Sequence, residues 1–278
     1  MTIPVADTLR LPGITLQGVA CAGIKTCLMV PELKLMFDVA PSVAGQQKFN
    51  RVLVSHGHHD HLAGLPYACS QRSLGRRAPL EVHAPEELVP PMERIFEAWR
   101  EILAHELPVA LHGHAPGDTV PLSRTMTARC VRSVHRIPSL CWVVNQTVSS
   151  LDPKFAGLPG EVLAAKRKAG ETIRVSRTAD TLAVTGDTQI ELIDREPWLW
   201  DVDVLVHEVT GWGDKQSVDK VRGWGHTHVD EIIERVERFT GKALVLVHRS
   251  ARHSRSMAQR VVAERFPASV RDRVHVFG

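Results

Sequence analysis

A dense group of residues that can bind metal lies in the stretch SHGHHDHLAG. His56 and His58 are two positions apart, and Asp60 and His61 follow directly. Imidazole and carboxylate groups are ligands for Zn²⁺, and also for Mn²⁺ or Fe²⁺. A tight loop could direct His56 and His58 toward one ion and Asp60 and His61 toward a second ion nearby. The skipped residue, His59, is expected to face outward or to support the loop.

Further candidate ligands each end an apolar run elsewhere in the chain. His135 follows VRSV, Asp187 follows LAVTG, and His248 follows LVLV. The carboxylate of Asp187 is a group that can bridge two cations. Because a metal site usually needs ligands from several segments, we expect these residues to join the histidine group. A solvated polar loop with incidental histidines is the alternative interpretation, and the recurrence of ligand-type residues at strand ends argues against it.

Predicted strands and helices must position these residues. The runs RVLVS, TLAVTGDT, DVDVLVHEV and ALVLVH predict buried strands, and the first fifty residues predict a meander of short ones. Residues 229–239 predict an amphipathic helix. The Pro90–Pro91 pair either kinks a predicted helix or moves its start to Pro91. Residues 158–170 predict a short helix closed by Gly170.

Length and composition bound the architecture. The 278 residues are 44% hydrophobic and 23% charged, so the chain can bury a sizeable core. We see no linker, repeat or low-complexity tract, and we expect residues 1–278 to form a single α/β domain with two packed sheets and helices outside. The formal net charge of +3 neither requires nor excludes a nucleic-acid partner.

Cysteine usage and terminal sequence indicate a compartment. The cysteines are odd in number and none forms a C-x-x-C pair, so we expect reduced thiols at Cys21, Cys27, Cys69, Cys130 and Cys141. The N-terminal residues lack a signal-peptide pattern, and no apolar run is long enough to cross a bilayer. We therefore expect a soluble, cytoplasmic protein with no membrane partner.

The motif H-x-H-x-D-H after a strand, with later His, Asp and His at strand ends, resembles the metallo-β-lactamase superfamily. Within it the chain most resembles ribonuclease Z, the endonuclease that removes the 3′ trailer of precursor tRNA, in the short form found in plants. The resemblance extends from the first strands to the last. It is most specific at SHGHHDHLAGLP, VTGDT, HEVT, GHTHVDEI and LVLVHRSARH. It implies an αββα sandwich of two mixed sheets with helices outside.

The resemblance also implies two Zn²⁺ ions per subunit, with Mn²⁺ or Fe²⁺ as possible substitutes, and precursor tRNA as the partner. It implies that the first ion is bound by His56, His58 and His135, that the second is bound by Asp60, His61 and His248, and that Asp187 bridges them. It further implies a homodimer, in which one subunit often helps to hold the RNA that the other cleaves.

The catalytic residues implied by the resemblance are Asp60, Glu208 and His226. Two neighbouring cations would produce a hydroxide that attacks phosphorus. His226, polarised by Glu208, would protonate the leaving ribose 3′-oxygen, which is a poor leaving group otherwise. Asp60 would bind metal and accept a hydrogen bond from the nucleophile. His207 precedes Glu208, and because strand side chains alternate, only one of the two should face the site.

Many bacterial ribonucleases Z project a long flexible arm that grips the tRNA elbow, between the ligands matched here by His135 and Asp187. In this chain the interval has one short basic helix with Lys166, Arg167 and Lys168, and we expect no long arm. That absence favours the main alternative, a hydrolase of the same fold acting on a small ester, lactone, thioester or phosphodiester. A non-catalytic nucleic-acid-binding relative is disfavoured, because every candidate ligand is present.

Other residues have less specific expectations. His112 and His114 form a second H-x-H pair, which we expect in a surface turn. His228 either caps the helix that follows it or contacts substrate. Trp212 and Trp224 are expected to pack, although aromatic residues near such a site can stack on a base.

Basic residues follow His248 closely, and they either contact phosphates or form a solvated face. They are Arg249, Arg252 and Arg255.

Overall fold

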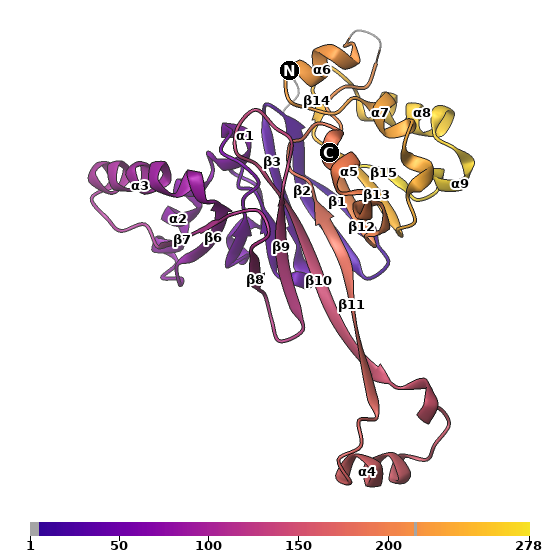
Figure 1. The fold of residues 1–278 in the computed structure, drawn as a ribbon. Coiled ribbons are helices and arrows are strands. Elements are labelled where there is room, and N and C mark those ends of the chain that lie inside the picture. The colour runs from indigo at the N-terminus through magenta and orange to yellow at the C-terminus, as the bar shows by residue number, and fades with distance from the viewer. Residues whose placement is uncertain (1–5, 214–215) are drawn as a thin grey trace.

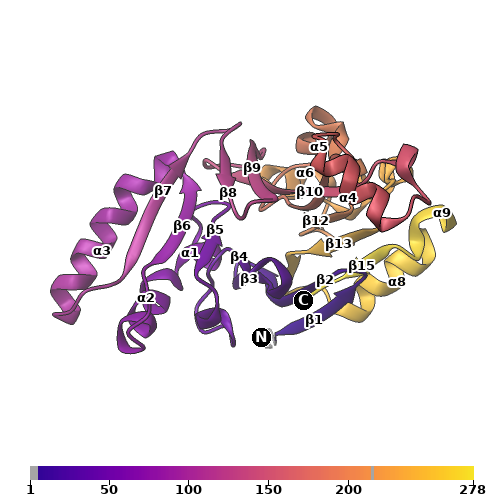
Figure 2. The ribbon, with the colours of Figure 1, turned by 90° about the horizontal axis from the view of Figure 1, so that it is seen from below.

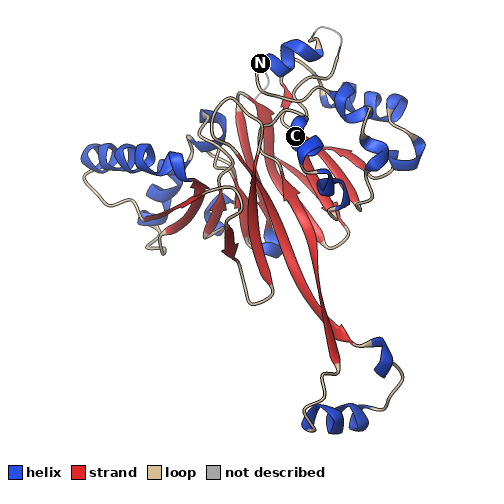
Figure 3. Ribbon diagram, in the orientation of Figure 1, coloured by secondary structure: helices blue, strands red, loops and turns tan. Residues whose placement is uncertain are grey.

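The chain folds into two β-sheets that pack face to face, with helices on both outer faces (Figures 1 and 3). The computed structural model describes residues 6–213 and 216–278. Within those residues the first sheet has the order β1-β2-β3-β4-β5-β6-β7, and β14 pairs with β2. Its strands are β1 Asp7–Leu11, β2 Ile14–Ala22, β3 Lys25–Val30, β4 Leu35–Phe37, β5 Arg51–Leu53, β6 Leu80–Pro85, β7 Val109–His114 and β14 Arg249–Ser250.

The second sheet has the order β15-β13-β12-β11-β10-β9-β8 in the described part of the chain. Its strands are β8 Thr119–Pro121, β9 Met126–Arg132, β10 Leu140–Leu151, β11 Arg174–Val184, β12 Val204–Glu208, β13 Ala243–Val247 and β15 Val274–Val276. The strands β11, β12, β13 and β15 run parallel, whereas β8 to β11 are antiparallel neighbours, so the sheet is mixed.

Apolar side chains fill the space between the sheets and beneath the outer helices. Leu28, Phe37 and Leu53 of the first sheet share one buried cluster with Trp142 and Val206 of the second. Figure 2 shows α2 and α3 beside the first sheet, and α8 and α9 beside the second. The helices are α1 His59–Leu62, α2 Leu65–Leu74, α3 Val89–Leu103, α4 Gly160–Lys168, α5 Glu191–Arg195, α6 Val218–Gly223, α7 Val229–Ile233, α8 Arg255–Arg265 and α9 Ala268–Arg271. The predicted αββα sandwich is confirmed.

Two sequence expectations about helices have different outcomes. The helix α3 begins at Val89 with the proline pair in its first turn, so the prolines set its start and do not kink it. The predicted helix over residues 229–239 is wrong, because α7 ends at Ile233 and a 3₁₀ turn follows at Val236–Arg238. That turn still brings Val236 into the core beside α7, which is why the apolar spacing resembled one continuous helix.

The expectation that the chain lacks an arm is wrong. The strands β10 and β11 continue far beyond the sandwich as a two-stranded ribbon, and α4 lies at its tip (Figure 1). We call residues 145–180 the arm. It begins at a register shift between Val144 and Asn145, where the buried positions of β10 end. The run NQTVSS that follows is mostly polar, which suits a ribbon surrounded by water.

At the arm tip, Phe155 is buried beneath Lys154 and Lys166, whose ammonium groups lie 4.8 and 5.3 Å from the centre of its ring. This small cluster gives the tip a packed centre of its own. Among the described residues, no helix combines the length and the apolar character that crossing a membrane requires.

Candidate metal centre

The predicted ligands gather at one edge of the sandwich, at the carboxyl ends of strands from both sheets. The residues that follow β5 are His56, His58, Asp60 and His61, and those that follow β9, β11 and β13 are His135, Asp187 and His248 respectively. In the described part of the chain, ligand-type atoms lie within 4.8 Å of one another in the groups His56–His58–His135–Asp187, Asp60–His61–His248 and Asp187–His226–His248. The structure therefore brings together all seven predicted ligands.

Close backbone contacts make this convergence possible. Gly186 has a φ of +60°, and a Cβ there would lie 2.5 Å from the Cβ of Ser55. Only glycine lets the two strand ends approach so closely. His248 also adopts a positive φ, of 60°, which is strained for a residue other than glycine. Such strain at a strand end that carries a ligand is typical of functional sites.

A buried aspartate that our sequence analysis missed orients two of the histidines. Asp38 accepts hydrogen bonds from the backbone N–H of Ser55 at 2.6 Å, from Ser55 Oγ at 2.8 Å and from His61 Nδ1 at 2.7 Å. Because Ser55 Oγ donates its proton to Asp38, it accepts the hydrogen bond from His56 Nδ1 at 2.9 Å. Asp38 directly follows the apolar strand β4. Asp187 was predicted because it is an acidic residue at the end of an apolar strand, and the same pattern applies to Asp38.

Two other histidines are oriented in the same way. His135 Nδ1 donates to the carbonyl oxygen of Gly225 at 2.8 Å. Thr210 Oγ1 donates to Glu208 Oε2 at 3.0 Å, so it accepts from His248 Nδ1 at 3.1 Å. Partners of this kind hold a metal-binding imidazole in one tautomer and one orientation. In each case Nδ1 donates a hydrogen bond, so a cation would be bound through the lone pair of Nε2.

These lone pairs point toward one another instead of toward hydrogen-bond donors. His61 Nε2 lies 3.2 Å from His248 Nε2, and both nitrogens lie 3.3 Å from Asp187 Oδ1. That oxygen is buried and accepts no hydrogen bond from any described residue. A tetrahedral ion bound at about 2.0–2.1 Å holds its ligand atoms about 3.4 Å apart. The donor atoms therefore fit a cation, which would relieve the repulsion between their lone pairs.

The first group has matching dimensions. His58 Nδ1 lies 3.0 Å from His56 Nε2 and 3.3 Å from His135 Nε2. Asp187 Oδ2 lies 3.5 Å from His56 Nε2. Asp187 thus directs one carboxylate oxygen to each group, which is the arrangement that a bridging ligand requires. Asp60 Oδ2 completes the second group, 3.4 Å from His248 Nε2, and it accepts a hydrogen bond from the backbone of Gly23.

The protonation of the histidines differs between the groups. Burial lowers the pKa of His56, His58 and His135, which keeps their lone pairs available. Burial also opposes charge on His61, but the carboxylates of Asp187 and Asp38 outweigh it and raise the pKa of His61 well above its ordinary value. A cation at the second group must displace that proton, so its affinity should rise with pH.

The predicted Glu208–His226 pair is formed. Glu208 Oε1 accepts a hydrogen bond from His226 Nδ1 at 2.7 Å, and the carboxylate is almost fully buried. Burial disfavours the imidazolium, but the charge of Glu208, this hydrogen bond and the charge of Asp187 raise the pKa of His226 to about 9. His207 donates instead to the backbone oxygen of Glu208, so Glu208 is the residue of the two that faces the site.

The structure can also be compared with what the sequence predicted for His59, His228, His112 and His114. His59 is exposed, as expected. His228 accepts from the backbone N–H of Asp230 and caps α7, as one of its two interpretations proposed. The surface turn expected for His112 and His114 is wrong, because both lie in strand β7, which pairs with β6.

Two of the arginines that follow His248 are used within the fold. Arg249 donates to the carbonyl oxygen of Gly278 at 2.8 Å, and Arg255 pairs with Asp7 at 2.7 Å. Neither is free to contact a phosphate in this conformation, whereas Arg252 is exposed.

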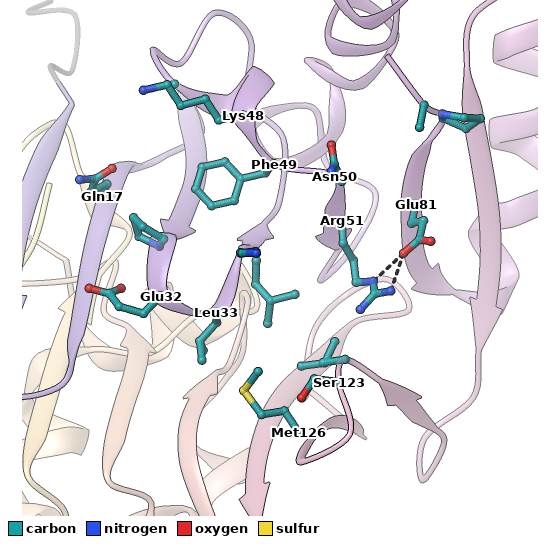
Figure 4. A pocket seen from close by; sticks show the side chains of 17 residues that line it. Gln17, Glu32, Leu33, Lys48, Phe49, Asn50, Arg51, Glu81, Ser123 and Met126 are labelled. Atoms are coloured by element: carbon teal, nitrogen blue, oxygen red, sulfur yellow. Dashed lines mark hydrogen bonds and ion pairs between the residues drawn. The ribbon is translucent and has the colours of Figure 1, made fainter.

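A separate cavity of about 1040 Å³ opens at the other end of strand β5, at Arg51 (Figure 4). Arg51 in its lining pairs with Glu81 at 2.6 Å, and none of the candidate metal ligands lines the cavity. The chemistry therefore belongs at the carboxyl ends of the strands.

The fold and the site together define a hydrolase with the metallo-β-lactamase fold. A family model described as a β-lactamase superfamily domain matches residues 29–249. The metallo-β-lactamase fold protein YhfI from Bacillus subtilis superimposes with a TM-score of 0.62 over 93% of each chain, at 13% identity. The short form of human tRNase Z superimposes with a TM-score of 0.59, also over 93% of each chain, at 18% identity.

Two plant sequences are more similar. The chain is 30% identical to tRNase Z TRZ1 of Arabidopsis thaliana over 250 residues, which cover 88% of this chain and 89% of the relative. It is 32% identical to the chloroplastic tRNase Z TRZ2 of the same plant over 249 residues, which cover 88% of this chain and 70% of the relative. The chain belongs to the tRNase Z family of the β-lactamase superfamily, and it is a metal-dependent hydrolase. The predicted resemblance is confirmed.

Proposed function

We propose that the protein is an endoribonuclease that removes the 3′ trailer of precursor tRNA with the help of two divalent cations per subunit, Zn²⁺ in the first place and Mn²⁺ or Fe²⁺ as alternatives. The Glu208–His226 pair beside the candidate ligands carries this proposal. A ribose oxygen is a poor leaving group unless it is protonated, and a positioned histidine supplies that proton. The names of the two plant relatives support the same activity.

The ligand assignment follows the two groups of donor atoms. We assign the first cation to His56, His58 and His135, the second to Asp60, His61 and His248, and the bridging position to Asp187. Two bound cations would lower the pKa of a water molecule and stabilise the charge that develops on the phosphate.

The protein residues perform the proton transfers. The Nδ1–H of His226 is held by Glu208, which leaves Nε2 as the atom that delivers a proton to the leaving 3′-oxygen. Glu208 stabilises the imidazolium before the transfer, and the raised pKa of His226 keeps that proton in place near neutral pH. Asp60, held by the backbone of Gly23, is positioned to accept a hydrogen bond from the attacking nucleophile. Its own pKa is lowered, because contacts with His248 and His61 outweigh the effect of burial.

The arm supports an RNA substrate. Its tip helix α4 carries Lys166, Arg167 and Lys168 in its last turn, and basic side chains that neutralise phosphates supply much of the affinity for a nucleic acid. Strand β10 starts beside the metal centre and ends in the arm, and at about 3.3 Å per residue it spans roughly 35 Å. The arm thus points away from the metal centre of its own subunit.

A homodimer would bring an arm and a metal centre from different subunits onto one RNA. Large apolar side chains are exposed on neighbouring helices α2 and α3, which gives a second copy of the chain a surface to bind. They are Tyr67, Leu74, Ile95, Trp99 and Ile102. We propose this surface as the dimer interface.

Parallel assays test the function. The protein is loaded with Zn²⁺ or Mn²⁺ and given a precursor tRNA with a 3′ trailer, a chromogenic phosphodiester and a lactone. We expect cleavage of the precursor at one position and no turnover of the lactone. Intact RNA together with lactone turnover would contradict the proposal and favour the small-ester alternative.

Charge changes in the arm test how RNA is held. Replacing Lys166, Arg167 and Lys168 with glutamine should raise KM for precursor tRNA and weaken its salt dependence, while the chromogenic phosphodiester is cleaved as before. The matched control replaces three exposed cations of the body with glutamine, namely Arg10, Lys34 and Lys48. An equal rise in KM in both variants would mean that the arm has no special part in binding.

A further inference from the structure

Trp224 lies at the rim of the metal centre, in the loop between α6 and α7. His226 follows it two positions later. The next residue, Gly225, accepts the hydrogen bond from His135 Nδ1, and a Cβ at this glycine would lie 2.8 Å from the same nitrogen. The backbone of Trp224 is thereby held between a candidate metal ligand and the proposed proton donor.

The indole ring of Trp224 is flanked by two cations. Lys220 Nζ lies 5.6 Å from its centre and Arg252 Cζ lies 6.0 Å from it. Both cations lie at the outer limit of cation–π contacts, farther from the ring than the 4.0 Å that separates Arg129 from the ring of Trp198. Arg252 comes from the segment that follows His248, so two separate ligand-bearing segments supply the ring and one of its cations.

Trp224 differs in this respect from the other tryptophans of the second sheet and its helices. Trp142, Trp200 and Trp212 are buried in the apolar clusters, and Trp198 lies under the guanidinium of Arg129, 4.0 Å away. Trp224 is partly exposed and belongs to none of the buried clusters found in the described residues.

The indole N–H groups of these tryptophans have different surroundings. Those of Trp142, Trp198 and Trp212 donate to Val54, Glu196 and Val209, and that of Trp200 is buried without an acceptor, whereas Trp224 is partly exposed and has no acceptor among the described residues. Packing in a buried cluster therefore does not account for the position of the Trp224 side chain.

We propose that Trp224, with Lys220 and Arg252 beside it, is a nucleotide platform that stacks the unpaired base next to the cleaved phosphate. This inference rests on the proposed function. Proteins that bind single-stranded nucleic acid combine aromatic side chains, on which bases stack, with basic side chains that contact the adjoining phosphates. A base inside a duplex cannot stack on such a ring, so the platform selects substrates whose nucleotides are unpaired at the cleavage site.

Abasic substrates test the stacking directly. Precursor tRNAs that lack the base on the 5′ side or on the 3′ side of the cleaved bond are compared with the complete precursor. For the wild-type protein, kcat/KM should fall about tenfold or more when the base is removed on one of the two sides. Trp224→Ala should cleave the complete precursor as slowly as the wild-type protein cleaves the abasic one. Removing the base should slow the variant no further, because the two changes remove the same interaction.

Several controls separate stacking from a loss of structure. Trp224→Phe should recover most of the discrimination, because phenylalanine still offers a ring. Trp198→Ala is the matched control, since it removes a partly buried tryptophan away from the rim, and it should discriminate between the substrates as the wild-type protein does. Bound metal should be unchanged in Trp224→Ala.

Specific outcomes would overturn the inference. The inference fails if the wild-type protein cleaves the abasic and complete precursors equally fast, or if Trp224→Ala distinguishes between them as the wild-type protein does. Loss of metal from Trp224→Ala would also overturn it. If the wild-type protein cleaves no RNA at all, the proposed function fails and the platform with it. If it cleaves RNA with unchanged discrimination in Trp224→Ala, only the platform fails.

Discussion

Two clusters of histidines lie in the same molecule, and both contain an H-x-H pair. One is the candidate metal centre, which begins with His56 and His58. The other comprises His83 of β6 with His112 and His114 of β7. In this second cluster His83 Nδ1 lies 2.9 Å from His114 Nε2, and the rings of His83 and His112 stack with their centres 4.8 Å apart.

The clusters differ in the carboxylates that accompany them. Asp38, Asp187 and Glu208 are buried within the metal centre and each contacts a histidine. The nearest carboxylate of the second cluster is that of Asp118, which is half exposed and lies 3.9 Å from His114 Nδ1. Among the described residues, the second cluster does not bring three ligand-type atoms together.

The position along the strands explains this difference. His83 and His112 are direct neighbours in the register of β6 and β7, so their rings stack across the sheet. The ligands of the metal centre follow the carboxyl ends of their strands, where loops allow side chains from both sheets to converge. Burial and the nearby histidines lower the pKa of His83 to about 3, so this ring stays neutral at ordinary pH. An H-x-H pair therefore indicates a metal site only when buried carboxylates and ligand-type residues from other strand ends lie beside it.

Removing the bridging carboxylate should have the largest effect. Asp187→Asn keeps the shape of the side chain but removes the charge shared by both donor groups. We expect loss of bound metal and a fall in precursor cleavage of about 10³-fold or more, since the cations supply both the nucleophile and the charge stabilisation. Metal analysis and single-turnover cleavage measure this. Full metal content in the variant would contradict the bridging role.

Removing the proposed proton donor should separate chemistry from metal binding. His226→Ala should retain its metal, while precursor cleavage falls about 10²–10⁴-fold, the usual contribution of a general acid. The chromogenic phosphodiester, whose aryl leaving group needs little protonation, should lose much less. His226 also lies near Asp187 and His248, so a loss of metal would identify it as a ligand instead.

The same histidine should set an alkaline limit to activity. The protonated form is the active one, so cleavage of precursor tRNA should fall about tenfold per pH unit once the pH exceeds the pKa of about 9. Glu208→Gln removes the charge that raises this pKa, so the limit should move to lower pH. A pH profile of kcat that is identical in both proteins would show that another group sets it.

Asp38 should matter less, because it acts through other residues. Asp38→Asn weakens the hydrogen bonds that orient His61 directly and His56 through Ser55. We expect metal affinity to fall about 10–100-fold, as is usual when such a supporting partner is lost. Competition with a chelator measures the affinity, and excess metal should restore most of the activity. A variant that excess metal does not rescue would place Asp38 in the chemistry itself.

The sequence predicted the chemistry of this region better than its geometry. The seven candidate ligands could be predicted because each follows an apolar strand and is of a residue type that binds metal, and the structure gathers them at one edge. The Glu208–His226 pair was predicted from the family resemblance, and the structure shows the hydrogen bond between the two side chains. Asp38 was missed although it follows β4 in the same way, since it lies outside the familiar motif. Tautomers and lone-pair directions depend on Thr210 and the carbonyl oxygen of Gly225, and no local pattern indicates those contacts.

The arm shows the opposite limit. Residues 145–151 are polar and β-branched, and alternation between buried and exposed positions is what identifies a strand in a sequence. A ribbon with water on both sides has no such alternation, so the apolar pattern does not indicate how far β10 and β11 extend. The second H-x-H pair was misplaced for a related reason, because Gly113 and Pro116 suggested a turn. In the fold, Gly113 lies in β7 against Glu86, where a Cβ would approach to 3.0 Å.

Changes in the second histidine cluster should have the smallest effect. His112→Ala removes an exposed ring that only stacks on His83, and the metal centre receives no support from it. Bound metal and precursor cleavage should stay within about twofold of wild type, and stability should change by about 0.5 kcal/mol or less, as for most exposed positions. Metal analysis, cleavage rates and thermal unfolding measure these quantities. If His112→Ala instead lost metal or activity, the histidines of β6 and β7 would be coupled to the metal centre, and carboxylate support would no longer be what separates the two clusters.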